Sequence, residues 1–210
     1  SDASHWRYAG AFFRLNYSYD NRYLFEVNGR YDGSSKFPNN SQWGFFPSAS
    51  AAWRLSEERF WKVDPKFLSN VKLRMSYGAL GNSNVNPYSY LEKFSLSTFS
   101  TTGTSTDGRY LDGSAKLRYT KNPSQIPDNI GWETSKTVDV GIDLGFLHNK
   151  ITLSADYYVR KTIDMYTVGP TLPDTFGASS PKGNYADMST YGYEISLGYN
   201  DSFKLADRPL

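Results

Sequence analysis

Apolar and polar side chains alternate along several short segments of this chain, and that alternation is the period of a β-strand. Between Tyr23 and Asp32, aromatic, aliphatic and Gly residues fall on odd positions, and mostly polar residues fall on even positions. Successive side chains of a strand point to opposite faces, so the segment predicts one apolar and one polar face. Residues 11–20 repeat the pattern, and Asp20-Asn21 favours a tight turn between the two segments. An antiparallel hairpin is therefore expected.

Five further segments alternate in the same way: 48–55, 71–78, 137–144, 151–160 and 191–200. The chain has 17 Tyr, 13 Phe and 5 Trp, and aromatic residues suit a pleated surface better than a helix. We therefore predict an all-β fold with an antiparallel sheet of about seven strands. The exception is 56–70, where Ser56 before two Glu resembles a helix N-cap and Pro65 would end the helix, so one short interfacial helix is expected.

The predicted connections alternate in length. Tight turns are expected at 20–21 and 147–150, and long loops near 33–44, 80–131 and 164–187, with extra strands within the second loop at 90–96 and 110–119. Bacterial outer-membrane barrels show this asymmetry, with brief periplasmic turns and longer extracellular loops. An open run of seven strands would leave two unpaired edges, so the chain is interpreted as part of a larger barrel.

Alternation by itself does not separate a membrane barrel from a soluble sandwich, because each has one apolar and one polar face. Two features favour the barrel. Aromatic residues gather toward both ends of the predicted strands, like the interfacial girdles of a barrel. The polar face combines Gly with Ser, Asn and Asp, which suits a crowded, wet lumen better than a freely solvated surface of Lys and Glu. The residues predicted to face this lumen are Glu26, Arg30, Arg74, Asp139, Asp143, Asp156 and Glu194.

Several function classes find no support in the residues. The formal net charge of +2 comes from scattered charges, without the basic stripe that nucleic acid requires. The chain has no Cys, and neither His5 nor His148 has a second ligand at metal spacing, so no metal site and no cofactor are predicted. There is no nucleophile motif and no phosphate-binding glycine loop, so an enzyme is not expected.

Polar and aromatic residues of the predicted long loops are the candidates for ligand contact. Such groups stack on or hydrogen-bond a sugar or a peptide, but they also fold loops and contact partner proteins. The candidates are Trp43, Asn82, Asn84, Tyr88, Arg109 and Tyr110.

The stretch Arg30–Phe37 with Trp43–Ser48, continued by Ala52-Trp-Arg and Val71–Gly78, resembles the SusC/RagA family of TonB-linked outer-membrane proteins. Trp132-Glu-Thr, Asn184 and Gly192-Tyr-Glu also fit, so the resemblance spans nearly the whole chain.

The resemblance implies a 22-stranded barrel with an N-terminal plug, and residues 1–210 would be part of its barrel domain. It also implies energy supply through TonB, a SusD-like surface lipoprotein as partner, and import of glycans or peptides across the outer membrane of a Gram-negative, Bacteroidetes-like bacterium. Outer-membrane lipid would surround the barrel. The alternatives from the residues are a passive porin and a soluble β-rich carbohydrate-binding module.

Overall fold

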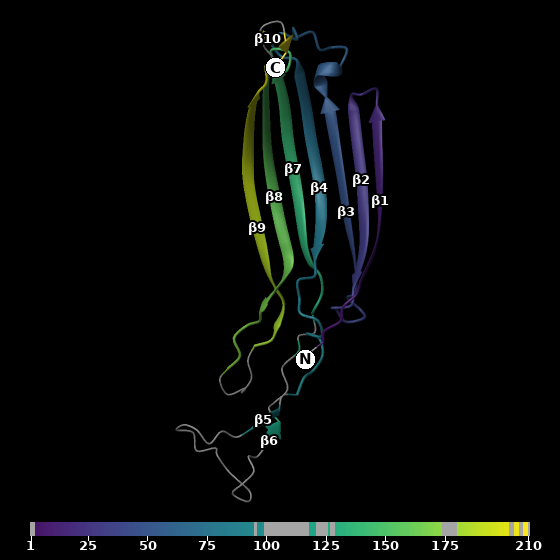
Figure 1. The fold of residues 1–210 in the computed structure, drawn as a ribbon, viewed down its shortest axis with the longest axis vertical. Helices are drawn as coiled ribbons and strands as arrows, with labels where there is room; N and C mark the ends of the chain where they lie inside the picture. The colour runs from purple at the N-terminus through teal and green to yellow at the C-terminus, as the bar shows by residue number, and fades with distance from the viewer. Residues whose placement is uncertain are drawn as a thin grey trace, which may run out of the picture.

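A single antiparallel sheet of seven long strands dominates the computed structural model (Figure 1). The structure describes residues 3–94, 96–98, 118–120, 126, 129–173, 180–201, 204–205 and 208–209. The strand order is β1-β2-β3-β4-β7-β8-β9, so each long strand pairs with the next long strand along the chain. These strands are β1 (Tyr8–Tyr19), β2 (Tyr23–Ser34), β3 (Trp43–Arg54), β4 (Asn70–Asn82), β7 (Glu133–Phe146), β8 (Ile151–Val168) and β9 (Lys182–Tyr199). The all-β prediction and its seven antiparallel strands are confirmed.

The remaining elements are small. A 3-10 turn, η1 (Leu55–Glu57), follows β3, and two short hairpins pair β5 (Leu96–Thr98) with β6 (Arg118–Thr120) and β10 (Lys204–Leu205) with β11 (Arg208–Pro209). The helix expected over 56–70 is wrong, because η1 is followed by hydrogen-bonded turns and extended chain. The extra strands expected at 90–96 and 110–119 overlap β5 and β6 at their ends, and 110–117 lie outside the described residues.

Both expected tight turns are present at the end of the sheet drawn uppermost in Figure 1. Asp20 and Asn21 have φ of 48° and 55°, and Leu147, His148 and Asn149 have φ of 51°, 56° and 63°. Non-glycine residues adopt this left-handed conformation mainly in turns, where Asn and Asp tolerate it best. The long connections β2–β3, β4–β7 and β8–β9 leave from the opposite end.

The strands extend further than the alternation predicts, so two of the three long connections are shorter than expected. Residues 33–34 and 43–44 belong to β2 and β3, which leaves 35–42 between them. Residues 164–168 and 182–187 belong to β8 and β9, which leaves 169–181. The pairing of β8 with β9 is irregular between Thr162 and Tyr166, where Asp164 has a φ of 58°.

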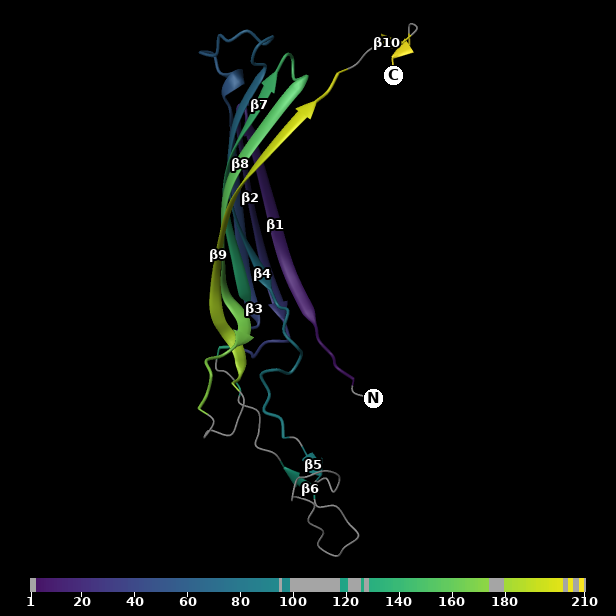
Figure 2. The same cartoon turned by 90° about the vertical axis from the view of Figure 1, so that its left-hand side faces the viewer.

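The register aligns the predicted faces across the whole sheet. Seen from its β9 edge in Figure 2, the sheet is a curved wall. Along one continuous row Phe25 pairs with Ala51, Ala51 with Met75, Met75 with Val140 and Val140 with Tyr157. In the part of the chain that the structure describes, no second layer packs on this apolar face, and no helix has the length and apolarity to cross a bilayer.

Candidate functional site

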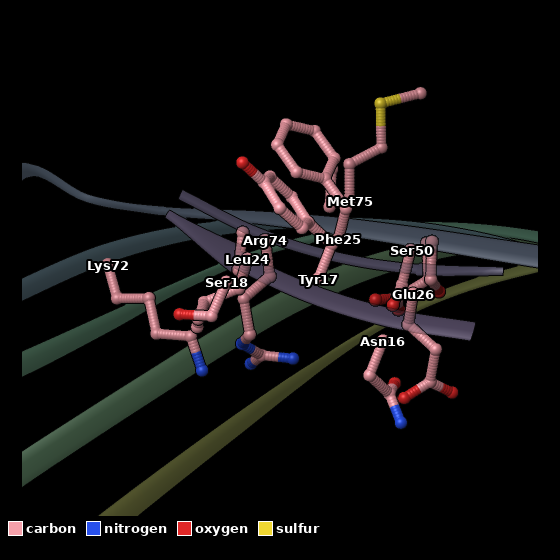
Figure 3. Close-up of a pocket in the computed structure, with 14 residues that line it drawn as sticks. Asn16, Tyr17, Ser18, Leu24, Phe25, Glu26, Ser50, Lys72, Arg74 and Met75 are labelled. Carbon is pink, nitrogen blue, oxygen red and sulfur yellow. The ribbon is translucent and has the colours of Figure 1, made fainter. Parts of the chain in front are cut away.

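The two faces of the sheet differ in chemistry, and the apolar face is uncovered by any other described residues. Tyr193 keeps 81% of its surface exposed, and Phe25, Val27, Met75 and Val140 are exposed as well. Figure 3 shows Tyr17, Phe25 and Met75 on one side of the strands and Asn16, Glu26, Lys72 and Arg74 on the other. A water-soluble sheet would place such an apolar face in its core, so this arrangement is the inverse of a soluble protein.

Aromatic rings mark both ends of the apolar face. At the tight-turn end, Tyr23 lies between Tyr19 and Trp53, with ring centroids 6.4 Å and 6.2 Å apart. At the long-loop end, Tyr31 stacks on Trp43 with centroids 5.0 Å apart. Tyr23 and Tyr31 are separated by about 27 Å along β2 at roughly 3.4 Å per residue. Before allowing for strand tilt, this spacing is similar to the apolar band of a membrane barrel, about 25 Å tall.

A network of ion pairs crosses the polar face between β4, β7 and β8. The guanidinium of Arg74 donates to both carboxylate oxygens of Asp143, at 2.8 Å and 2.9 Å, and to Asp156 at 3.1 Å. Ser154 donates to Asp143 at 2.8 Å, and the Nζ of Lys72 lies 3.8 Å from the same carboxylate. The planar guanidinium therefore joins three strands, through a bidentate contact with Asp143 and a single hydrogen bond to Asp156.

Gly141 makes room for this network. It stands between Arg74 and Asp156 in the register, and a Cβ atom there would lie 1.9 Å from Asp156 Oδ1. A larger residue would force the Asp156 carboxylate aside, so the absence of a side chain lets the ion pair form across β7.

The other residues predicted to face the lumen lie on the same polar face. Glu26 accepts from Arg14 at 2.6 Å and from Asn28 at 2.7 Å. Arg30 donates to Asp32 at 3.0 Å and 3.1 Å. The register places Asp139 in the row of Glu26, and Glu194 opposite Asp156. The structure thus brings these residues together on one face, and their contact with a lumen stays a prediction.

Replacing Arg74 by Met is expected to lower the stability of the folded barrel by about 2–3 kcal/mol, because it leaves two partly buried carboxylates without their shared donor. Arg14→Met is the matched control. Its ion pair with Glu26 is more exposed, so the expected loss is under about 1 kcal/mol. The thermal midpoint of the full-length protein, read from heat-dependent migration in gels, measures both. Equal shifts would contradict a special role for the three-strand network.

At the long-loop end, a small apolar cluster joins two connections. Its buried members are Phe37 from the β2–β3 connection and Val85 and Ile130 from the β4–β7 connection. The ring centroid of Trp132 lies 5.2 Å from that of Phe37. Trp132 donates from Nε1 to the carbonyl of Gln42 at 3.1 Å and meets Phe46 edge-on at 5.3 Å. Gly81 allows this approach, because a Cβ there would lie 2.0 Å from the Phe46 ring.

Asn184 of β9 fastens the same region to the sheet. Its amide oxygen accepts from the backbone nitrogen of Gly131 at 2.9 Å, and its amide nitrogen donates to the carbonyls of Gly131, at 3.3 Å, and Asp164. Asn129 donates to the carbonyl of Asn184 at 3.0 Å. One side chain therefore links the β4–β7 connection with the β8–β9 hairpin. We call this region, with the buried cluster of Phe37, Val85 and Ile130, the rim cluster.

The predicted ligand contacts take different positions around the rim. Asn82 and Asn84 are exposed, and Asn82 bonds both the amide of Asn84 at 3.1 Å and Glu133 at 3.5 Å. Tyr88 donates its hydroxyl to the carbonyl of His5 at 3.0 Å, and Trp43 lies on the apolar face against Tyr31. Arg109 and Tyr110 lie outside the described residues. Ligand contact by these residues stays a prediction.

The tight-turn end has its own partly buried carboxylate. Glu58, just after η1, accepts from Tyr23 at 2.6 Å, from Trp53 at 3.0 Å and from Arg22 at 3.2 Å. The hydrogen bonds from Tyr23 and Trp53, followed by Arg22, hold the pKa of Glu58 below its ordinary value. These contacts therefore stabilise the fold above the ordinary pKa of a glutamate and are lost as the pH falls through the lowered pKa.

Three features of the site were missed by the sequence analysis: the rim cluster, the bridging role of Arg74 and the Glu58 contacts. The polar alternation signalled Arg74, whereas nothing local signalled the partners of Phe37 or Glu58. Among the described residues, no group of three or more His, Cys, Asp or Glu side chains is arranged to hold a metal ion.

Comparison with known proteins gives consistent matches. The family model described as TonB dependent receptor-like, beta-barrel, matches residues 1–208. The chain is 39% identical over 186 residues to TonB-dependent receptor P3 of Formosa agariphila, and 36% identical over 188 residues to TonB-dependent receptor SusC of Bacteroides thetaiotaomicron. Each alignment covers 89% of this chain but 17% and 18% of the relatives, so the chain spans less than a fifth of their length.

A solved structure supports the same relationship. The RagAB peptide importer in its closed-closed state matches with a TM-score of 0.73 and 25% identity, over 94% of this chain and 20% of that chain. TonB-dependent receptors are outer-membrane proteins of Gram-negative bacteria and act as transporters. With a family model matching nearly every residue and a sheet whose apolar face is uncovered, the chain belongs to the TonB-dependent receptor-like β-barrel family and is a relative of SusC and RagA.

Proposed function

We propose that this chain forms part of the wall and the extracellular rim of an energy-dependent outer-membrane importer of glycans or peptides. The observation that carries the proposal is the inverted sheet: exposed apolar side chains such as Val140 and Tyr193 on one face, and the Arg74 network on the other. The first face suits hydrocarbon and the second suits a water-filled interior.

The remaining parts of the proposal follow from the relatives. The full-length protein is a 22-stranded barrel with a plug, takes energy through TonB, and pairs with a SusD-like surface lipoprotein in a Bacteroidetes-like bacterium. Support comes from the relative SusC and from the structural similarity to the RagAB peptide importer. The exposed Asn82 and Asn84, beside the rim cluster, are hydrogen-bonding groups for a sugar or a peptide.

Uptake by cells tests this function. A strain lacking the full-length gene, and the same strain carrying it again, are given a fluorescent oligosaccharide mixture or a fluorescent peptide mixture. Uptake of one mixture is expected to require the gene and also TonB. Uptake that needs the gene but survives deletion of TonB would favour a passive porin instead.

Cell fractionation tests the location separately. The full-length protein is expected in the outer-membrane fraction with a heat-dependent gel migration, because the apolar face needs lipid to cover it. A soluble, folded product would contradict the importer and support a β-rich binding module.

A further inference from the structure

The connection between β3 and β4 combines exposed aromatic rings with basic side chains. Phe60 and Phe67 keep 63% and 70% of their surface exposed, and Val63 lies between them, exposed as well. Arg59, Lys62 and Lys66 are interleaved with these residues and are also exposed. Residues 59–68 contain these three basic residues and one acidic residue, Asp64, so the segment carries a net positive charge.

Backbone hydrogen bonds hold the connection in the conformation that exposes these rings. The backbone amide of Trp61 donates to the backbone carbonyl of Glu58 at 3.0 Å, and those of Phe67 and Leu68 donate to the backbone carbonyl of Asp64 at 2.9 Å and 3.1 Å. The end of the connection is fastened to the end of β7, since the amide of Ser69 donates to the carbonyl of Gly145 at 2.7 Å. Hydrogen bonds therefore hold the connection at both ends, while the rings of Phe60 and Phe67 stay exposed.

The contacts of Glu58 place this connection beside the apolar face of the sheet. Its carboxylate accepts from Tyr23 and Trp53, which form the aromatic belt at the tight-turn end of that face. Figure 2 shows the connection as the blue trace above η1, over the ends of β3 and β4. The exposed rings thus continue the apolar surface just beyond its aromatic belt.

Aromatic rings interleaved with Lys and Arg are the composition that binds the surface of a bilayer. The rings enter the boundary between headgroups and acyl chains, and the basic groups pair with lipid phosphates. The attraction is strongest for lipids with a net negative charge. A soluble protein partner would be expected to present acidic groups to the same segment, but the continuity with the lipid-facing belt favours the membrane.

We propose that the β3–β4 connection is a membrane-surface anchor that binds anionic phospholipid on the tight-turn side of the bilayer. Phe60 and Phe67 enter the headgroup boundary, and Arg59, Lys62 and Lys66 hold lipid phosphates. The anchor rests on the proposed function, because it needs a barrel in a membrane. It would fix the height of this end of the wall relative to the lipid surface.

A fluorophore near the anchor tests its depth without removing its rings. These 210 residues contain no Cys, so Val63→Cys can be labelled in the full-length protein after any other cysteine is changed to serine. The labelled protein is placed in phosphatidylcholine vesicles that contain phosphatidylglycerol and a lipid-borne quencher. Quenching is expected, and it should be lost in the same protein carrying Phe60→Ser and Phe67→Ser.

Two further labels separate this inference from the proposed function. Leu15→Cys reports the apolar face and should be quenched, whereas Asn16→Cys reports the polar face and should not. An unquenched Leu15 label would overturn the membrane barrel itself. A quenched Leu15 label beside an unquenched Val63 label would overturn the anchor alone, whether water or protein surrounds the segment.

A separate pair of substitutions tests whether the anchor prefers anionic lipid. With the quencher carried on phosphatidylglycerol or on phosphatidylcholine in turn, the ratio of quenching at Val63→Cys reports which lipid gathers there. Lys62→Gln with Lys66→Gln should lower that ratio by up to about twenty-five-fold, at a factor of roughly five for each basic residue. The matched control is Lys136→Gln with Lys161→Gln, a facing pair at the other end of the sheet. An unchanged ratio in the first pair, or an equal fall in both, would overturn the anionic-lipid site.

Discussion

Phe37→Ala is expected to open the long-loop end of the sheet while the strands remain assembled. The Phe37 side chain is 0% exposed and lies in the rim cluster with Val85 and Ile130. Removing a buried Phe ring costs about 3–5 kcal/mol through lost burial and the cavity left behind. The loss falls on the connections, because the strand ladders form separate hydrogen bonds and local opening needs less free energy than unfolding the sheet.

Hydrogen exchange in the full-length protein measures this opening. The amides of Ser34 and Gly131, bonded to Gln42 and Asn184, are expected to exchange roughly a hundredfold to a thousandfold faster, at about 1.4 kcal/mol per factor of ten. Phe45→Ala removes the same ring from the exposed apolar face and should leave these amides almost unchanged. Comparable acceleration in both variants would contradict the role of the cluster.

Val140→Arg is expected to destabilise the barrel by about 2–4 kcal/mol, because a charged side chain at the bilayer midplane loses its hydration. Val140 lies near the middle of β7, pairs with Met75 and is 51% exposed on the apolar face. Ser76→Arg is the matched control. Ser76 is opposite Asp139 on the polar face, at the same height of the wall, and should accept the new charge at little cost.

Assembly into the outer membrane, together with the thermal midpoint in gels, measures both variants. The expected result is impaired assembly or a lowered midpoint for Val140→Arg and near-normal behaviour for Ser76→Arg. The reverse order would show that the face assignment is inverted, and the importer proposal would fail with it.

The sheet could be predicted because its information is local. Alternation along 23–32 fixes which side chains share a face, and a turn such as Asp20-Asn21 fixes which strands are neighbours. The ends of the strands were harder to predict. Residues such as Lys161 and Thr162 continue β8 beyond its apolar stretch, where the alternation weakens although the backbone pairing persists.

The contacts across distant segments could not be read from the chain. Phe37 and Ile130 stand in loops without periodicity, and their burial depends on how the β2–β3 and β4–β7 connections pack against each other. Asn184 entered the sequence analysis through the family resemblance, which says nothing of its three backbone partners. The short helix was wrong for a related reason: Glu58 bonds to Tyr23 and Trp53 instead of extending a helix.

The strands differ in length, and this makes the mouth of the wall oblique. β8 and β9 have 18 residues each, whereas β1, β2 and β3 have 12. At about 3.3 Å per residue, β8 and β9 are therefore longer by roughly 20 Å. In Figure 1 the tight-turn ends of the strands lie at a similar level, and β8 and β9 reach further at the opposite end. A large molecule approaching this mouth would meet a tall side at β8–β9 and a low side at β1–β3, and would have freer lateral access over the low side.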